Sequence, residues 1–144
     1  MTVRVERVIE IPAPPADVWE FIVDPKNRAR PISVVTDYAT DDPTGREATW
    51  YLKLPIPLID KRIAVETEDV QRDAPRFVKF TGRSKVMNVV GEHELVETDE
   101  GTQLTNRFSV DGRVPGVERF FKRNLESEMK NLEDELLEAL GFRL

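Results

Sequence analysis

The sequence predicts an α+β domain in which a curved antiparallel sheet of seven strands surrounds one long C-terminal helix, with two short helices between the first two strands. Alternating apolar and polar stretches separated by turn residues fill the segment 33–111, which is typical of antiparallel strands with short links. Apolar residues recur at three- and four-residue steps over 114–140, as in an amphipathic helix. A chain of 144 residues fits a single domain, 1–144.

The first strand and the two short helices come from the N-terminal part of the chain. Apolar and charged side chains alternate over residues 2–11, which predicts a strand with one wet face, although Arg7 interrupts the apolar positions. Pro15 suits the first position of a helix, and the pair Asp24-Pro25 suits the start of a second one. We therefore expect two short helices before the second strand.

Six further strands are expected in the middle of the chain. Turn-favouring groups such as Thr44-Gly45 and Thr81-Gly82 separate them. The expected strands are 33–40, 47–54, 61–70, 76–81, 86–97 and 102–110.

The long helix is the natural cover for this sheet. A helix over 114–140 would be about 40 Å long at 1.5 Å per residue. A sheet must bury one face, and this helix has the only long apolar stripe in the sequence. A strongly curved sheet around one helix often leaves a space inside, and concave apolar spaces are where small ligands bind.

Composition and charge exclude several classes of protein. The net charge of −6 disfavours binding to nucleic-acid phosphates. The chain has no cysteine and one histidine, which excludes a thiolate or histidine-rich metal site, and we expect neither a metal nor a cofactor. No apolar run reaches 18 residues, so we expect no membrane-spanning segment. The start of the chain lacks the features of a signal peptide, so we expect a cytoplasmic location.

The segment 10–25, which reads Glu-Ile-Pro-Ala-Pro-Pro-Ala-Asp-Val-Trp-Glu-Phe-Ile-Val-Asp-Pro, resembles the opening signature of the START/SRPBCC superfamily. The segments 91–95 and 100–105 and the terminal amphipathic helix agree, so that the resemblance covers essentially the whole chain. The hairpin 54–61 is most similar to the polyketide cyclase/dehydrase and CoxG-like branches. At 29–31 the chain lacks the tryptophan that many relatives have there. The resemblance implies a Bet v 1-like helix-grip fold with a hydrophobic-ligand cavity, or an accessory role beside a redox enzyme.

Two polar residues are expected on the inner face of the sheet. His93 shares its strand parity with Met87 and Leu95, so its ring should point inward. It could hydrogen-bond a ligand carbonyl, act as a general base if the protein is an enzyme, or simply be a buried histidine satisfied by a neighbour. Asn106 either ties strands together or meets the polar end of a ligand, because a buried amide needs partners. Thr67 could add a hydroxyl group.

Aromatic side chains dominate the other candidates. In a sheet that grips a helix, the core and the wall of a pocket are the same surface, so aromatic residues at these spacings serve either purpose. The candidate ligand-binding residues are Trp19, Trp50, Thr67, Phe80, His93, Asn106, Phe108, Val117, Phe120 and Phe121.

The connection 54–59 is unusually apolar, with four aliphatic residues and two prolines. We expect it to form the lip or lid of the cavity. If it were exposed, its side chains would form a patch that could dock a partner protein. These side chains belong to Leu54, Ile56, Leu58 and Ile59.

Three functions follow from these patterns. The leading hypothesis is binding or carriage of a small hydrophobic molecule, such as a lipid, a quinone or a polyketide-like compound, between the sheet and the C-terminal helix. The first alternative is a cyclase or dehydratase acting on a hydrophobic substrate, with His93 as its base. The second is an accessory interaction module that docks through 54–59.

Overall fold

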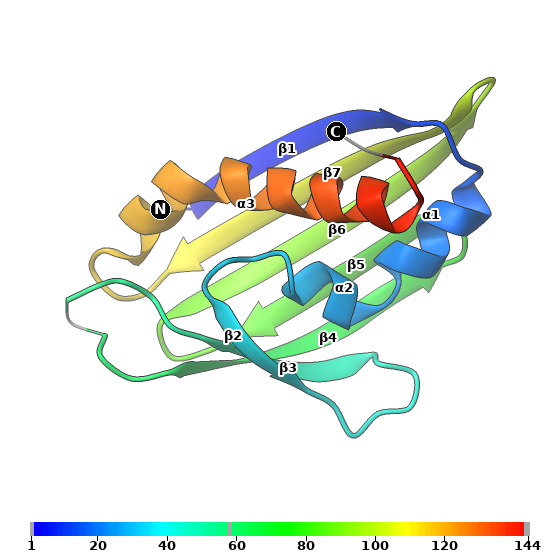
Figure 1. Cartoon of the computed structure of the whole chain (residues 1–144). Coiled ribbons are helices and arrows are strands. Elements are labelled where there is room, and N and C mark those ends of the chain that lie inside the picture. Colours follow the sequence, from blue (N-terminus) through cyan, green and yellow to red (C-terminus); the bar gives the residue numbers. More distant parts are fainter. Residues whose placement is uncertain (1, 58, 143–144) are drawn as a thin grey trace.

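The computed structural model describes residues 2–57 and 59–142. Within them, an antiparallel seven-stranded sheet curves around the helix α3, while the shorter helices α1 and α2 lie near the C-terminal half of α3 (Figure 1). The predicted helix-grip α+β fold is confirmed. The elements are β1 Thr2–Ile11, α1 Pro15–Ile22, α2 Pro25–Ala29, β2 Val35–Ala39, β3 Glu47–Leu52, β4 Ile63–Asp73, β5 Phe77–Arg83, β6 Met87–Thr98, β7 Gly101–Gly112 and α3 Val117–Ala139.

The strand order explains why the short helices close one end of the molecule. The order across the sheet is β1-β7-β6-β5-β4-β3-β2, so that β1 and β2 are the two edges. The chain between them must cross the full width of the sheet, and it does so through α1 and α2 (Figure 1). These helices therefore cover one end of the space between the sheet and α3.

The predicted element boundaries shift where the backbone departs from regular geometry. The sequence predicts that the fourth strand ends at Val70, whereas β4 continues to Asp73. The pairing register shifts between Asp69 and Gln71, and this shift breaks the alternation there. The long helix begins at Val117 rather than at 114. Gly116 precedes it with φ +96°, a left-handed conformation that glycine adopts without strain.

Arg7 occupies an inward position on β1 because it has a partner on α3. Its Nε donates to Oε2 of Glu133 at 2.7 Å, and its Nη2 donates to Oε1 of the same carboxylate at 3.1 Å. Glu133 is buried. The interruption in the apolar pattern of the first strand thus marks a charged contact between the sheet and the helix.

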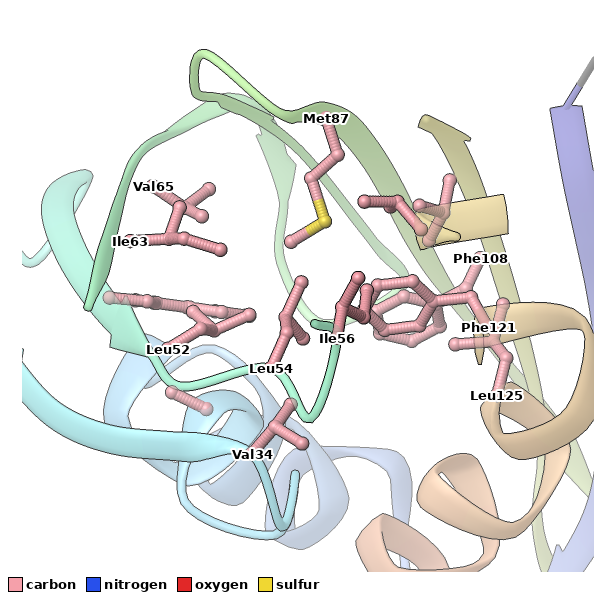
Figure 2. Packing of buried hydrophobic residues seen from close by; sticks show 14 of the residues in the cluster. Val34, Leu52, Leu54, Ile56, Ile63, Val65, Met87, Phe108, Phe121 and Leu125 are labelled. Atoms are coloured by element: carbon pink, nitrogen blue, oxygen red, sulfur yellow. The ribbon is translucent and has the colours of Figure 1, made fainter. Parts of the chain in front are cut away.

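The interior consists of two apolar clusters separated by polar side chains of the sheet. The first cluster lies under the N-terminal half of α3, where Phe121 and Leu125 face Met87 (Figure 2). The second lies between α1 and the C-terminal half of α3. Between them runs a row of cross-strand neighbours, which we call the polar row: Arg7 on β1 pairs with Asn106 on β7, and Asn106 pairs with His93 on β6.

Candidate functional site

A small cavity lies inside the first cluster, between the inner face of the sheet and α3. The space that the centre of a water molecule can occupy is about 40 Å³. Its walls are almost entirely apolar, and two methionines on opposite sides, from β6 and α3, belong to them. The principal apolar side chains are Leu52, Val65, Met87, Val110, Leu125 and Met129.

Five of the ten predicted ligand-binding residues line this cavity. They are Trp50, Thr67, Phe80, Phe108 and Phe121.

The other five lie elsewhere. Trp19 packs against the second cluster, and Val117 is buried in the first cluster without reaching the cavity. Phe120 packs edge-on against Phe121, with the ring centroids 5.0 Å apart. His93 and Asn106 are fully buried in the polar row, at the boundary of the cavity wall rather than on it.

The aromatic wall depends on a glycine in the neighbouring strand. The ring of Phe80 lies 5.4 Å from that of Trp50 and 5.8 Å from that of Phe108, measured between centroids. A Cβ atom added at Gly91 would overlap the ring of Phe80. The missing side chain at Gly91 therefore gives this ring the space in which it lies across the sheet.

Arg28 brings a buried positive charge to the cavity wall. The carboxylate of Asp24 caps the start of α2 by accepting from the backbone N–H of Lys26 at 3.0 Å. One turn later, Nη2 of Arg28 donates to both carboxylate oxygens of Asp69, at 2.9 and 2.8 Å. Its Cζ lies 5.0 Å from the centroid of the Phe80 ring. Burial lowers the pKa of Arg28, and the charge of Asp69 opposes that shift.

Some polar atoms on the cavity wall have hydrogen-bond partners and others have none. Among the residues that the structure describes, Nε and Nη1 of Arg28 and Nε1 of Trp50 are buried without a hydrogen-bond partner. The carboxylate of Glu128 accepts from the backbone N–H of Ser33 at 2.7 Å and from its hydroxyl at 2.9 Å. The hydroxyl of Thr67 donates to the carbonyl oxygen of Ala48 at 2.9 Å. The groups without partners on the cavity wall are therefore N–H donors, whereas Nε2 of His93 and Nδ2 of Asn106 are unpaired in the polar row outside it.

His93 is a neutral imidazole held by Asn106. Its Nδ1 lies 2.7 Å from Oδ1 of Asn106, and Nδ1 carries the proton because an amide oxygen can only accept. The ring is stacked on Phe80, with centroids 6.2 Å apart, and lies edge-on to Phe108 at 5.6 Å. Burial, followed by the charge of Arg28, lowers the pKa of His93 to about 3. At neutral pH the ring is therefore uncharged and a weak base.

A family model described as polyketide cyclase / dehydrase and lipid transport matches residues 2–137. The chain belongs to this family. The match covers the sheet, both short helices and nearly all of α3, which confirms the superfamily resemblance of the sequence. Among curated proteins, none matches the chain significantly.

Solved structures with the same fold include members with and without an assigned activity. A protein of Thermus thermophilus is 21% identical, with a TM-score of 0.70 over 96% of this chain and 99% of that one. The Zhui aromatase/cyclase from a Streptomyces species is 15% identical, with a TM-score of 0.71 over 99% of both chains. A protein of unknown function from Staphylococcus aureus is 14% identical, with a TM-score of 0.71 over 97% of this chain and 94% of that one. In the present protein, no helix of the described residues is long and apolar enough to cross a membrane.

The apolar connection after β3 turns inward. Leu54 and Ile56 are buried in the first cluster, where they point toward Met87 and Phe121 (Figure 2). Ile59 packs against the same cluster, and Leu58 lies outside the described residues. The alternative of an exposed docking patch therefore does not hold for Leu54 and Ile56, because both side chains lie in the core beneath the loop.

Arg28 lines the cavity but is not among the residues that the sequence predicts for the site. On β4, Asp69 continues the inward positions of Val65 and Thr67. A carboxylate at an inward position implies a buried partner. That pattern could have predicted a basic residue from another element, although it does not specify which one.

Proposed function

We propose that this protein binds a small, mainly apolar molecule in the cavity between the sheet and α3. The observation that carries this proposal is a cavity between sheet and helix with apolar walls and with N–H donors that have no partner among the described residues. A few placed polar groups in a mostly apolar cavity are typical of small-molecule sites. Lipids, quinones and polyketide-like compounds are the classes that the sequence suggests, and the family description also includes lipid transport.

The main driving force would be burial of the ligand's apolar surface. Each 100 Å² of apolar surface removed from water contributes roughly 2.5 kcal/mol. Only part of this appears as affinity, because the ligand loses translational and rotational freedom. A ligand must therefore contact both the sheet wall, such as Val65, and the helix wall, such as Phe121, to bind firmly.

Binding of such a ligand requires the cavity to expand. Sites for small-molecule ligands usually have volumes of roughly 300–1,000 Å³, whereas the present cavity has only about 40 Å³. Met87 and Met129 can change shape more easily than branched side chains, because their chains are flexible. Leu54 and Ile56 are buried in the same cluster, but neither lines the cavity.

Cyclase or dehydratase chemistry has less support. A general base works best when its pKa lies near the working pH, whereas His93 has a pKa of about 3 and does not reach the cavity. The aromatase/cyclase activity named for the Streptomyces protein belongs to a chain only 15% identical to this one. Docking through 54–59 has less support for a different reason, since Leu54 and Ile56 are buried.

Native mass spectrometry of the protein purified from its own cells tests the proposal. We expect a stoichiometric adduct that disappears on denaturation and is recovered as an apolar compound by solvent extraction. Phe121→Asp should abolish the adduct, because it places a charge in the cavity wall. The exposed substitution Arg119→Asp, on the same turn of α3, is the control. An adduct-free protein that also takes up no lipid or quinone on titration would contradict the proposal.

A further inference from the structure

We infer that the ligand presents a neutral carbonyl oxygen to the N–H donors of Arg28 and Trp50. This inference rests on the proposed function and names the polar group of the ligand. It comes from three features of the cavity wall: which donors lack partners, which acceptors are already used, and how the buried charges balance.

The unpaired donors belong to two side chains that line the same cavity. Nε and Nη1 of Arg28 and Nε1 of Trp50 are each buried and have no partner in the described part of the chain. A buried N–H without a partner is unfavourable, and proteins rarely leave one unsatisfied. A ligand oxygen that accepts from these groups would remove this cost at the moment of binding.

The carboxylate acceptors on the cavity wall, in contrast, already have hydrogen-bond partners. Both oxygens of Glu128 are engaged by Ser33, and Oε1 also accepts from Nδ2 of Asn131 at 3.3 Å. The wall therefore has spare donors and engaged carboxylate oxygens. A ligand group that only accepts fits this arrangement better than one that must donate.

The buried charges favour a neutral acceptor over a carboxylate. Asp69 contacts both Arg28 and Arg72, and Glu128 is a second carboxylate on the cavity wall. An incoming carboxylate would lose its hydration and would meet a guanidinium that is already paired with Asp69. A ketone, quinone or ester oxygen loses much less hydration and accepts the same hydrogen bonds.

The donors are also held in place before a ligand arrives. The two bonds from Nη2 to Asp69 and the contact with the Phe80 ring fix the guanidinium of Arg28. Trp50 is packed against the same ring. Donors that are already ordered lose little side-chain freedom on binding, so the hydrogen bonds add more to selectivity.

The test compares acetophenone with α-methylstyrene, in which a methylene group replaces the carbonyl oxygen with little change in shape. Benzoate is the anionic probe. Isothermal titration should give about tenfold tighter binding for acetophenone than for α-methylstyrene, the size expected for a buried hydrogen bond. Benzoate should bind more weakly than acetophenone.

Variants locate the origin of this preference. Trp50→Phe removes one donor and should reduce the preference for the ketone several-fold, while Trp19→Phe, outside the cavity, should leave it unchanged. Arg28→Lys keeps the positive charge beside Asp69 and removes the unpaired Nε and Nη1 donors, so it should also reduce the preference. Thermal unfolding of each variant checks that the fold is retained.

The outcomes separate the inference from the function on which it rests. Equal binding of acetophenone and α-methylstyrene to the unchanged protein would overturn the inference and leave apolar binding intact. Tighter binding of benzoate would overturn it by showing an anion site. Failure of all three probes to bind would count against the proposed function itself.

Discussion

Nδ1 of His93 donates to Oδ1 of Asn106 over 2.7 Å, and this bond joins β6 to β7 at a directly opposed pair. Both side chains are fully buried and lie in the polar row that divides the two apolar clusters. The amide can hold the neutral imidazole through one bond, but it provides no negative charge for an imidazolium. This hydrogen bond is available to the neutral and the charged ring alike, so burial and the charge of Arg28 are what disfavour protonation of His93.

This pair predicts that acid destabilises the fold. The unfolded chain binds a proton at His93 near pH 6.5, whereas the folded protein does so only near pH 3. Between these values the unfolded state binds more protons, so the free energy of unfolding falls as the pH falls. The loss from this group is roughly 5 kcal/mol over the full window, at about 1.4 kcal/mol per pH unit.

Urea denaturation at a series of pH values measures this effect. The slope between pH 5 and 6.5 is the most informative part, because most carboxylates titrate below it. In His93→Gln the slope in this interval should largely disappear, whatever the absolute stability of the variant. A slope that persists unchanged in His93→Gln would show that other groups cause the acid sensitivity.

The buried ion pair between Arg28 and Asp69 predicts that two aspartates of β4 contribute very differently to the free energy of unfolding. Asp69→Ala leaves Arg28 buried without its counter-charge and should lower the free energy of unfolding by about 3–5 kcal/mol. Asp73→Ala removes an exposed pair with Arg76 and should cost less than about 1 kcal/mol. Chemical denaturation of both variants makes the comparison, and similar losses would refute the role assigned to Asp69.

The contact between Gly91 and Phe80 predicts that a second substitution, at Phe80, restores part of the stability lost by a substitution at Gly91. Gly91→Ala puts a methyl group where the ring of Phe80 lies and should cost about 1–3 kcal/mol through overpacking. Phe80→Leu in the same protein should recover part of this loss, because the smaller side chain vacates the space. A double-mutant cycle that gives purely additive losses would mean that the two residues do not compete for space.

Two leucines of α3 separate cavity effects from general destabilisation. Leu125 lines the cavity, whereas Leu136 is buried in the second cluster. Replacing either one with alanine should cost about 2–5 kcal/mol of stability. Only Leu125→Ala should strengthen binding of bulkier apolar ligands, measured by titration. Equal effects of the two substitutions on binding would contradict the assignment of the cavity.

Periodicity along the sequence predicted the fold well because each element carries its own signal. The alternation along β6 and β7 placed His93 and Asn106 inward, and the apolar stripe of α3 identified the covering helix. Local irregularities are the features that periodicity did not predict. The register shift near Asp69 extends β4 beyond its predicted end, and Arg7 faces inward because Glu133 lies opposite it on α3.

The site was harder to predict because its polar groups meet only in three dimensions. Arg28 lies on a five-residue helix that offers little periodicity, and its partner Asp69 is 41 positions away. Trp50, Phe80 and Phe108 were found because inward aromatic residues of neighbouring strands must gather on one face. Trp19 was placed with them because helical spacing does not reveal which of two clusters a helix joins.

Fluorescence of single-tryptophan proteins tests the central claim most directly. Trp19→Phe leaves Trp50 on the cavity wall as the only tryptophan, and Trp50→Phe leaves Trp19 in the second cluster. Titration with a quinone should quench Trp50 saturably and leave Trp19 unchanged after correction for absorbance. Equal quenching of both tryptophans, or no saturable change at Trp50 with any apolar ligand, would contradict binding in the cavity.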